Sequence, residues 1–149
     1  HRAFPVIVTP MHRRWFDGEG RIQETFGEYP EAMRRVAAEL DVPLIDLHED
    51  SRLLFEALGK DGSCRAFVHY PANSFPGQTE PLKDNSHFSP YGAYQLAQCI
   101  LMGIREQVPG LAPHLRDRLP AFDPTKPDPF EAWQLPASPL FDLKVPEGN

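Results

Sequence analysis

In PEAMRRVAAELDVPLIDL, residues 30 to 47, an amphipathic helix pattern runs directly into a buried strand pattern, which indicates the fold class. Residues 30 to 40 have the apolar spacing of a helix, and Pro30 is acceptable in its first turn. Residues 42 to 47, VPLIDL, are typical of a strand buried on both faces of a parallel sheet. The expected apolar face of the helix consists of Met33, Val36, Ala37 and Leu40.

A similar strand pattern precedes this stretch, and a second helix pattern follows it. FPVIVTP, residues 4 to 10, is a short apolar, β-branched run bounded by prolines. A strand, a helix and a strand in this order predict a parallel pair joined by a right-handed crossover, and therefore an α/β fold. HEDSRLLFEALG, residues 48 to 59, predicts a helix with acidic residues near its start and Gly59 at its C-terminal stop.

The next segment is a predicted loop that leads to a third helix. Residues 60 to 83 contain Gly, Pro, Asn and Ser throughout, and a loop of this length is usually functional or disordered. Ser89 can cap the following helix, with Pro90 at its first position. The apolar stripe expected to pack on the sheet consists of Ala93, Leu96, Ala97, Ile100, Leu101 and Ile104.

The length and the proline distribution predict one domain with an irregular tail. The chain has 149 residues, enough for a single core, and 17 prolines that concentrate after Pro109. We therefore expect residues 1–108 to form the domain, and residues 109–149 to be a proline-rich tail packed on or wrapping it.

Charge and hydropathy exclude two classes of partner. A net charge of −6 argues against general nucleic-acid binding, which needs clustered Lys and Arg. The sequence contains no run of eighteen apolar residues, so no membrane span is predicted. No signal peptide is recognisable. The first residue is His1 rather than Met, as expected of a fragment. Cys64 and Cys99 do not make a disulfide framework, and we expect free thiols.

The sequence DNSHFSPYGAYQLAQ, residues 84 to 98, contains the main catalytic candidates. Asp84 could hold one nitrogen of His87, which would leave the other as a general base. The alternative is that Asp84 only caps a turn and His87 is an exposed loop residue. A DxxH pattern taken alone does not distinguish the two.

A metal site is a further possibility among the acidic and histidine residues. Two or three histidines with a carboxylate suit zinc, but the spacing here matches no tight ligand pattern such as HExxH. We therefore expect no metal and no cofactor, with Asp46 accepting from backbone donors and His48 opening the following helix. The residues weighed for this site are Asp46, His48, His69, Asp84 and His87.

MHRRWFDGEGR, residues 11 to 21, follows the first predicted strand and is a candidate substrate-binding segment. Arg13 and Arg14 could hold a carboxylate through paired hydrogen bonds, and Trp15 could stack on a sugar. The alternative is a solvated loop anchored by its aromatic residue. The full candidate binding set consists of His12, Arg13, Arg14, Trp15 and His69.

Three segments together resemble a known family. They are FPVIVTPMHRRWFDGEG, TFGEYPEAMRRVAAELDVPLIDLHEDSRLLFEALG and DNSHFSPYGAYQLA, in this order. The chain resembles, over roughly residues 4 to 106, the second half of SGNH/GDSL hydrolases of the rhamnogalacturonan acetylesterase group. The resemblance implies a flavodoxin-like three-layer α/β/α sandwich with a parallel sheet, of which this chain would form the C-terminal portion.

The resemblance also implies a catalytic role for the DxxH block, with Asp84 and His87 as the triad acid and base. In such enzymes a GDS block supplies the nucleophilic serine, and two further blocks supply the glycine and asparagine of the oxyanion hole. None of these three blocks occurs in the 149 residues. The serines present lack the Gly-Asp context of the nucleophile: Ser51, Ser63, Ser74, Ser86, Ser89 and Ser138.

The sequence therefore predicts the Asp–His part of a serine esterase that deacetylates a pectic polysaccharide such as rhamnogalacturonan. The expected partners are an acetylated acidic oligo- or polysaccharide, and a missing N-terminal segment or a complementing chain. Alone, the chain is expected to be inactive, because both nucleophile and oxyanion hole are absent. The alternative is a non-catalytic carbohydrate-binding or interaction module derived from such a hydrolase. Polymer-degrading relatives favour a periplasmic or extracellular location by analogy only.

Overall fold

The computed structural model describes residues 3–116 and 119–135, and it is a mixed α/β structure. The α/β class predicted from the sequence is confirmed. None of the helices in these two ranges combines the length and apolarity needed to cross a membrane. The helices are α1 (Tyr29–Glu39), α2 (Leu47–Gly62) and α3 (Pro90–Gln107), with short 3₁₀ turns at Ser63–Ala66, Ala112–His114 and Phe130–Ala132. The strands are β1 (Ile7–Val8), β2 (Leu44–Ile45), β3 (Phe67–Tyr70) and β4 (Leu82–Phe88).

The predicted parallel pair is present, but it is short. Strand β1 pairs with β2 in parallel, with Ile7 opposite Leu44 and Val8 opposite Ile45. Each strand has two residues, whereas the apolar runs that predicted them have six or seven. Prolines at the ends of these runs contribute to the difference, because proline has no N–H to donate to a ladder. Within the described residues β1 pairs with β2 alone.

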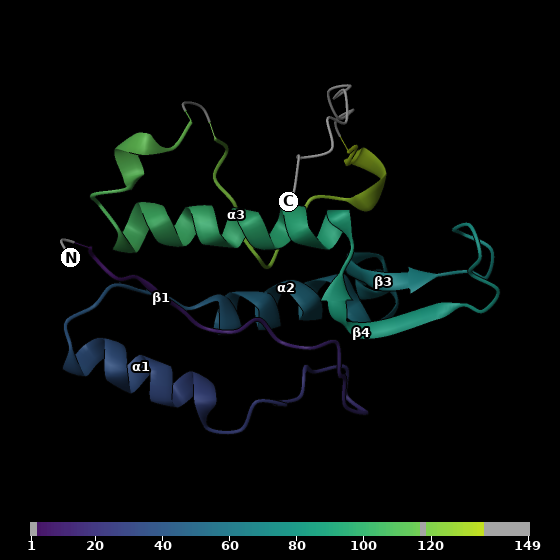
Figure 1. Ribbon diagram of the computed structural model, residues 1–149, viewed down its shortest axis with the longest axis horizontal. Helices are drawn as coiled ribbons and strands as arrows, with labels where there is room; N and C mark the ends of the chain where they lie inside the picture. Colours follow the sequence, from purple (N-terminus) through teal and green to yellow (C-terminus); the bar gives the residue numbers. More distant parts are fainter. Residues whose placement is uncertain (1–2, 117–118, 136–149) are drawn as a thin grey trace, which may run out of the picture.

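Helices α1 and α3 lie on opposite sides of β1 (Figure 1). Only Pro30 and Ala37 of α1 are buried, while Leu40 is 67% exposed and Val36 is also exposed. The predicted apolar face of α1 is therefore wrong except at Ala37, with Met33 only partly buried. The reason is geometric, because the surface of two paired two-residue strands is too narrow to cover the whole predicted apolar face of α1.

Helix α2 contributes two residues to the hydrophobic core. Leu54 and Phe55 are fully buried, and Phe55 meets Phe67 of β3 edge to face at 4.9 Å between centroids. The prediction that α2 ends at Gly59 is correct for the backbone break but not for the end of the helix. Gly59 leaves the helical region, with φ 71° and ψ 174°, but the chain re-enters a helical turn and continues to Gly62.

Helix α3 begins as predicted, but a different face is buried. Ser89 Oγ accepts a hydrogen bond from the Gly92 N–H at 3.2 Å, and Pro90 opens the helix. A Cβ on Gly92 would lie 2.0 Å from the Ala66 oxygen, so the backbones are in close contact. Small residues therefore select the buried face, and of the predicted stripe only Leu96 is buried. That face consists of Tyr91, Gly92, Gln95, Leu96, Gln98, Cys99 and Gly103.

The predicted loop over residues 60 to 83 is wrong, because it contains strand β3 and the start of β4. These strands are antiparallel, with Phe67 opposite Phe88 and His69 opposite Lys83. Val68 therefore faces residues 84–87, which bulge out of the ladder. FVHY is a β-prone run of only four residues among turn-forming neighbours, so its strand depends on pairing with β4.

The tail packs on the core where the structure describes it. Phe122 and Trp133 contact the core cluster, and the Asp128 carbonyl accepts hydrogen bonds from Tyr91 Oη at 2.6 Å and Gln95 Nε2 at 3.0 Å. The tail beyond residue 135 lies outside the described residues. The division into a domain of residues 1–108 and a tail of residues 109–149 stays a prediction.

Candidate functional site

Asp84 and His87 are hydrogen-bonded to each other inside the bulge of β4. Asp84 Oδ2 lies 2.7 Å from His87 Nδ1. Asp84 Oδ1 accepts from the backbone N–H groups of Ser86 at 2.7 Å and His87 at 2.9 Å. The N–H donors of His87 and Ser86, with the imidazole contact, lower the pKa of Asp84 to about 2. Asp84 is therefore an ionised acceptor, and His87 Nδ1 carries the proton that it accepts.

This arrangement leaves the second nitrogen of His87 free to act as a base. With Nδ1 protonated, Nε2 of a neutral imidazole holds the lone pair. The His87 side chain is 81% exposed. The residue directly after Phe88 is Ser89, the cap of α3, so the bulge is held between the β3–β4 ladder and a helix start.

None of the described serine hydroxyls is hydrogen-bonded to His87. Ser51 Oγ donates to the His48 carbonyl at 3.0 Å, and Ser89 Oγ donates to the Arg65 carbonyl at 2.6 Å. Both cysteines are free, as expected, but Cys99 is buried. Burial raises the pKa of the Cys99 thiol to about 12, so it is not a nucleophile. The described residues therefore hold an exposed, hydrogen-bonded Asp84–His87 pair without a serine beside it.

Within the described residues, the guanidinium of Arg14 is hydrogen-bonded to protein acceptors, unlike that of Arg13. The Arg14 guanidinium donates to Ser63 Oγ at 2.9 Å, to Asn85 Oδ1 at 3.2 Å and to the Lys60 carbonyl. Arg13 is exposed and lies over the Phe26 ring, with its Cζ 5.0 Å from the ring centroid. Of the two arginines, Arg13 is therefore the one whose head group faces solvent.

Trp15 lies beside the bulge. Its side chain is 51% exposed and lines an open depression of about 560 Å³. The depression is also lined by Asp84, Asn85 and Ser86, so the Trp15 ring and one catalytic candidate, Asp84, share one surface. His69 is near the same bulge but turned to protein, with Nε2 2.8 Å from Asn85 Oδ1.

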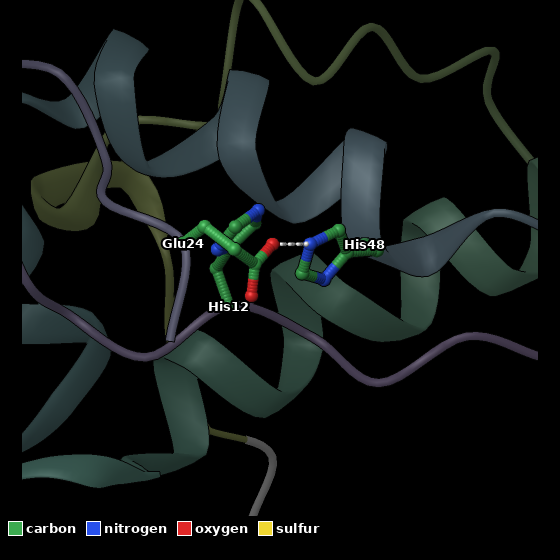
Figure 2. Close-up of side chains that lie close together, drawn as sticks. All are labelled: His12, Glu24 and His48. Atoms are coloured by element: carbon green, nitrogen blue, oxygen red, sulfur yellow. Dashed lines mark hydrogen bonds and ion pairs between the residues drawn. The ribbon is translucent and has the colours of Figure 1, made fainter. Parts of the chain in front are cut away.

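His12 is in a different place from the rest of the predicted binding set. It is 3% exposed and stacks on His48, with 3.7 Å between ring centroids (Figure 2). Burial, and then the neighbouring charge of His48, lowers the pKa of His12 to about 4, so its ring is neutral at pH 7. A buried, stacked imidazole cannot contact a polysaccharide. The burial of His12 could not be predicted from the sequence, because MHRRWF has no periodic pattern.

The cluster of His12, Glu24 and His48 resembles a metal site in composition, with one ligand atom of each within 4.8 Å of the others. His48 Nδ1 lies 2.9 Å from the Pro10 carbonyl and Nε2 lies 2.7 Å from Glu24 Oε2, so an imidazolium can donate to both. Two imidazoles on one tetrahedral ion, with bonds of about 2 Å, would hold their centroids about 5 Å apart. The stacked rings at 3.7 Å do not fit that geometry.

The residues weighed for a metal from the sequence are not gathered. Within the described residues, His12, Glu24 and His48 are the one group of three or more with clustered ligand atoms. Asp46 instead accepts from Thr9 Oγ1 at 2.9 Å and from Arg34 Nε at 2.8 Å, and it caps α2 through the Glu49 N–H. The expectation that Asp46 accepts from a backbone donor is confirmed by the Glu49 N–H.

Comparison with known proteins gives two relatives. The chain is 46% identical over 116 residues to the rhamnogalacturonan acetylesterase RhgT of Bacillus subtilis (strain 168), covering 78% of this chain and 50% of that protein. It is 31% identical over 104 residues to the probable rhamnogalacturonan acetylesterase YesY of the same strain, covering 70% of this chain and 43% of that protein. The chain thus spans about half the length of the curated relatives it matches.

Two other comparisons gave no match. No family model matches the chain, and the search of solved structures found no match. The assignment therefore rests on the two relatives, on the Asp84–His87 geometry and on the α/β elements. On these grounds, the aligned part of this chain belongs to the rhamnogalacturonan acetylesterase-like SGNH hydrolases.

Proposed function

We propose that this chain is the Asp–His-bearing part of a serine acetylesterase that removes acetyl groups from a pectic polysaccharide of the rhamnogalacturonan type. The observation that carries the proposal is the 2.7 Å hydrogen bond from His87 Nδ1 to Asp84, which leaves Nε2 as the base on an exposed surface. The names of the two relatives support the substrate class.

In the proposed reaction, His87 Nε2 takes the hydroxyl proton of a serine as the serine attacks the acetyl carbonyl. His87 then returns the proton to the leaving sugar oxygen. Water attacks the acetyl-serine with His87 again acting as base, and acetate and free serine result. Asp84 keeps the Nδ1 proton in place and stabilises the imidazolium at each step.

The serine and the oxyanion hole would come from sequence outside these 149 residues, from the same polypeptide or from a complementing chain. The edge of β1 supports this origin of the serine and the oxyanion hole, because within the described residues β1 pairs with β2 alone. Apolar side chains near this edge are exposed, including Phe4 and Val8. A further parallel strand would pair with the edge and cover such residues.

The test is hydrolysis of 4-nitrophenyl acetate together with an intact-mass measurement of the purified protein. Turnover should fall by about 10³-fold or more in His87→Ala when the serine-bearing part is present. The matched control is His114→Ala, which removes an exposed histidine of the tail and should leave turnover unchanged. Full turnover by His87→Ala would overturn the proposal. A chain of 16.9 kDa is expected to show no His87-dependent turnover by itself.

A non-catalytic carbohydrate-binding module is the second candidate. It is favoured by one observation, since none of the described serines bonds to His87 while Trp15 is exposed beside an open depression. This alternative predicts that His87→Ala keeps full affinity for acetylated rhamnogalacturonan oligosaccharides and that no turnover exists to lose. Turnover that depends on His87 would exclude it.

A further inference from the structure

The bulge that carries Asp84 and His87 is held at its two ends by the β3–β4 ladder and the start of α3, but its middle lies outside the ladder. Residues 84–87 face the single residue Val68, so they have few ladder hydrogen bonds of their own. The Asp84 carboxylate orders the interior of the bulge through Ser86 and His87. These contacts hold the residues of the bulge in place relative to one another, but they do not connect the bulge to the rest of the protein.

Asn85 supplies the connection to the rest of the protein. Its backbone oxygen accepts from the Arg14 N–H at 2.8 Å, and its Oδ1 accepts from Arg14 Nη1 at 3.2 Å. Arg14 has donors only, so the amide must present its oxygen to it. The same Oδ1 lies 2.8 Å from His69 Nε2, which must then carry a proton. Asn85 is thus held by the loop after β1 and by β3 at once.

The other side of the Arg14 guanidinium is attached to the end of α2. Nε donates to Ser63 Oγ at 2.9 Å and Nη2 donates to the Lys60 carbonyl. Ser63 is fully buried. Free carbonyls at a helix C-terminus favour a cation, which adds to these hydrogen bonds. Arg14 therefore joins a packed helix to the bulge.

We propose that Arg14 is a positioning residue, which acts through Asn85 to hold Asp84 and His87 where the nucleophile can be reached. This inference rests on the proposed function. Nε, Nη1 and Nη2 of Arg14 each donate to a protein acceptor, so the protein holds the head group in one orientation. A misplacement of about 1 Å at a reacting group can cost about 100-fold in rate. Lysine cannot replace the planar fork, since one ammonium cannot reach Ser63 and Asn85 with the same geometry.

The test measures kcat and KM for 4-nitrophenyl acetate in the active, serine-containing enzyme. Arg14→Lys and Asn85→Ala should each lower kcat by about 10- to 100-fold, with KM changed less than about twofold. The kcat of the double variant should lie within about twofold of the kcat of the slower single variant, because both changes break the same connection. The matched control is Arg35→Lys, an exposed arginine of α1, with unchanged kcat and KM.

The outcomes separate this inference from the proposed function. If His87→Ala abolishes turnover while Arg14→Lys and Asn85→Ala retain wild-type kcat, Arg14 is not a positioning residue and the proposed function stands. If His87→Ala retains turnover, the proposed function itself fails. Losses of kcat that multiply in the double variant would also contradict a shared connection. If Arg14→Lys lowers the melting temperature below the assay range, Asn85→Ala alone decides the matter by the same kcat and KM criteria.

Discussion

Asn85 accepts hydrogen bonds from Arg14 with both its backbone oxygen and its side-chain oxygen. The two residues are far apart in the sequence, and together they link the segment after β1 to the bulge of β4. The predicted binding set is thereby divided. Arg14 and His69 contact Asn85, His12 is buried elsewhere, and Arg13 and Trp15 face solvent.

Arg13 is expected to affect acidic substrates selectively. Arg13→Ala in the active enzyme should raise KM for an acetylated uronate-containing oligosaccharide by roughly fivefold, since a charge-assisted hydrogen bond contributes about 1 kcal/mol. Turnover of neutral 4-nitrophenyl acetate should not change. Arg35→Ala serves as the matched control. An equal loss on both substrates would show that Arg13 does not recognise a carboxylate.

The Asp84–His87 contact should persist to strongly acidic pH. Hydrogen bonds from the His87 and Ser86 N–H groups, with the imidazole contact, lower the pKa of Asp84 to about 2. The stabilising effect of a lowered carboxyl pKa is present above the unfolded value and is lost as pH falls through the folded value. A carboxyl ¹³C NMR titration should therefore place the Asp84 transition near pH 2 in the folded protein. A transition at or above pH 3.8 would show that the bonds to Asp84 do not form.

Asp50 is expected to destabilise the protein at neutral pH. Burial, and then the nearby charge of Asp46, raises the pKa of Asp50 from 3.8 to about 6. The Asp50 carboxyl ionises at a lower pH in the unfolded protein than in the folded protein. The free energy of unfolding therefore falls as pH rises from the unfolded pKa to the folded pKa, and it stays lower above that pH. After allowance for solvent screening, Asp50→Asn should stabilise the protein by about 1–2 kcal/mol at pH 7.5 and by little at pH 3.5.

This gain is measured as the shift in thermal midpoint at the two pH values. Glu80→Gln, an exposed carboxylate on the segment before β4, is the matched control. A gain of the same size at both pH values would mean that side-chain volume rather than ionisation is responsible.

Gly92 should not tolerate a side chain. A Cβ there would lie 2.0 Å from the Ala66 oxygen, so Gly92→Ala must separate α3 from the turn before β3 and should cost about 2–3 kcal/mol or more. Gly62→Ala is the matched control, because its nearest neighbour is the Leu58 Cβ at 4.0 Å. That change should be neutral or slightly stabilising. Denaturant unfolding of both variants measures the difference, and equal midpoints would show that the backbones are not in contact.

The Glu24–His48 hydrogen bond should stabilise the loop between β1 and α1. Glu24→Gln removes the charge that faces the His48 imidazole at 2.7 Å and should cost about 1 kcal/mol at pH 6. Glu19→Gln, at an exposed glutamate of the same loop, should cost much less. Urea unfolding is the measurement. Identical stabilities would mean that the pair contributes nothing net.

Local signals in the sequence were sufficient for several elements. The Ser89–Pro90 start of α3 follows from a side-chain cap and from the fixed φ of proline, both of which operate within one turn. The parallel pairing of β1 with β2 follows from the order of strand, helix and strand. The β3–β4 hairpin could not be predicted, because FVHY is too short to show a period and its ladder forms only on pairing.

The spacing of Asp84 and His87, the helix starts and the α/β class could be predicted, because each depends on residues close together along the chain. Folding alone brings Arg14 to Asn85, His12 to His48 and Gly92 to Ala66, and the sequence does not predict these contacts. These contacts join residues distant in the sequence, and a residue type alone does not show which partner a fold will bring to it. Arg13 and Arg14 are adjacent in the sequence, yet Arg13 is exposed while Arg14 donates to Ser63 and Asn85.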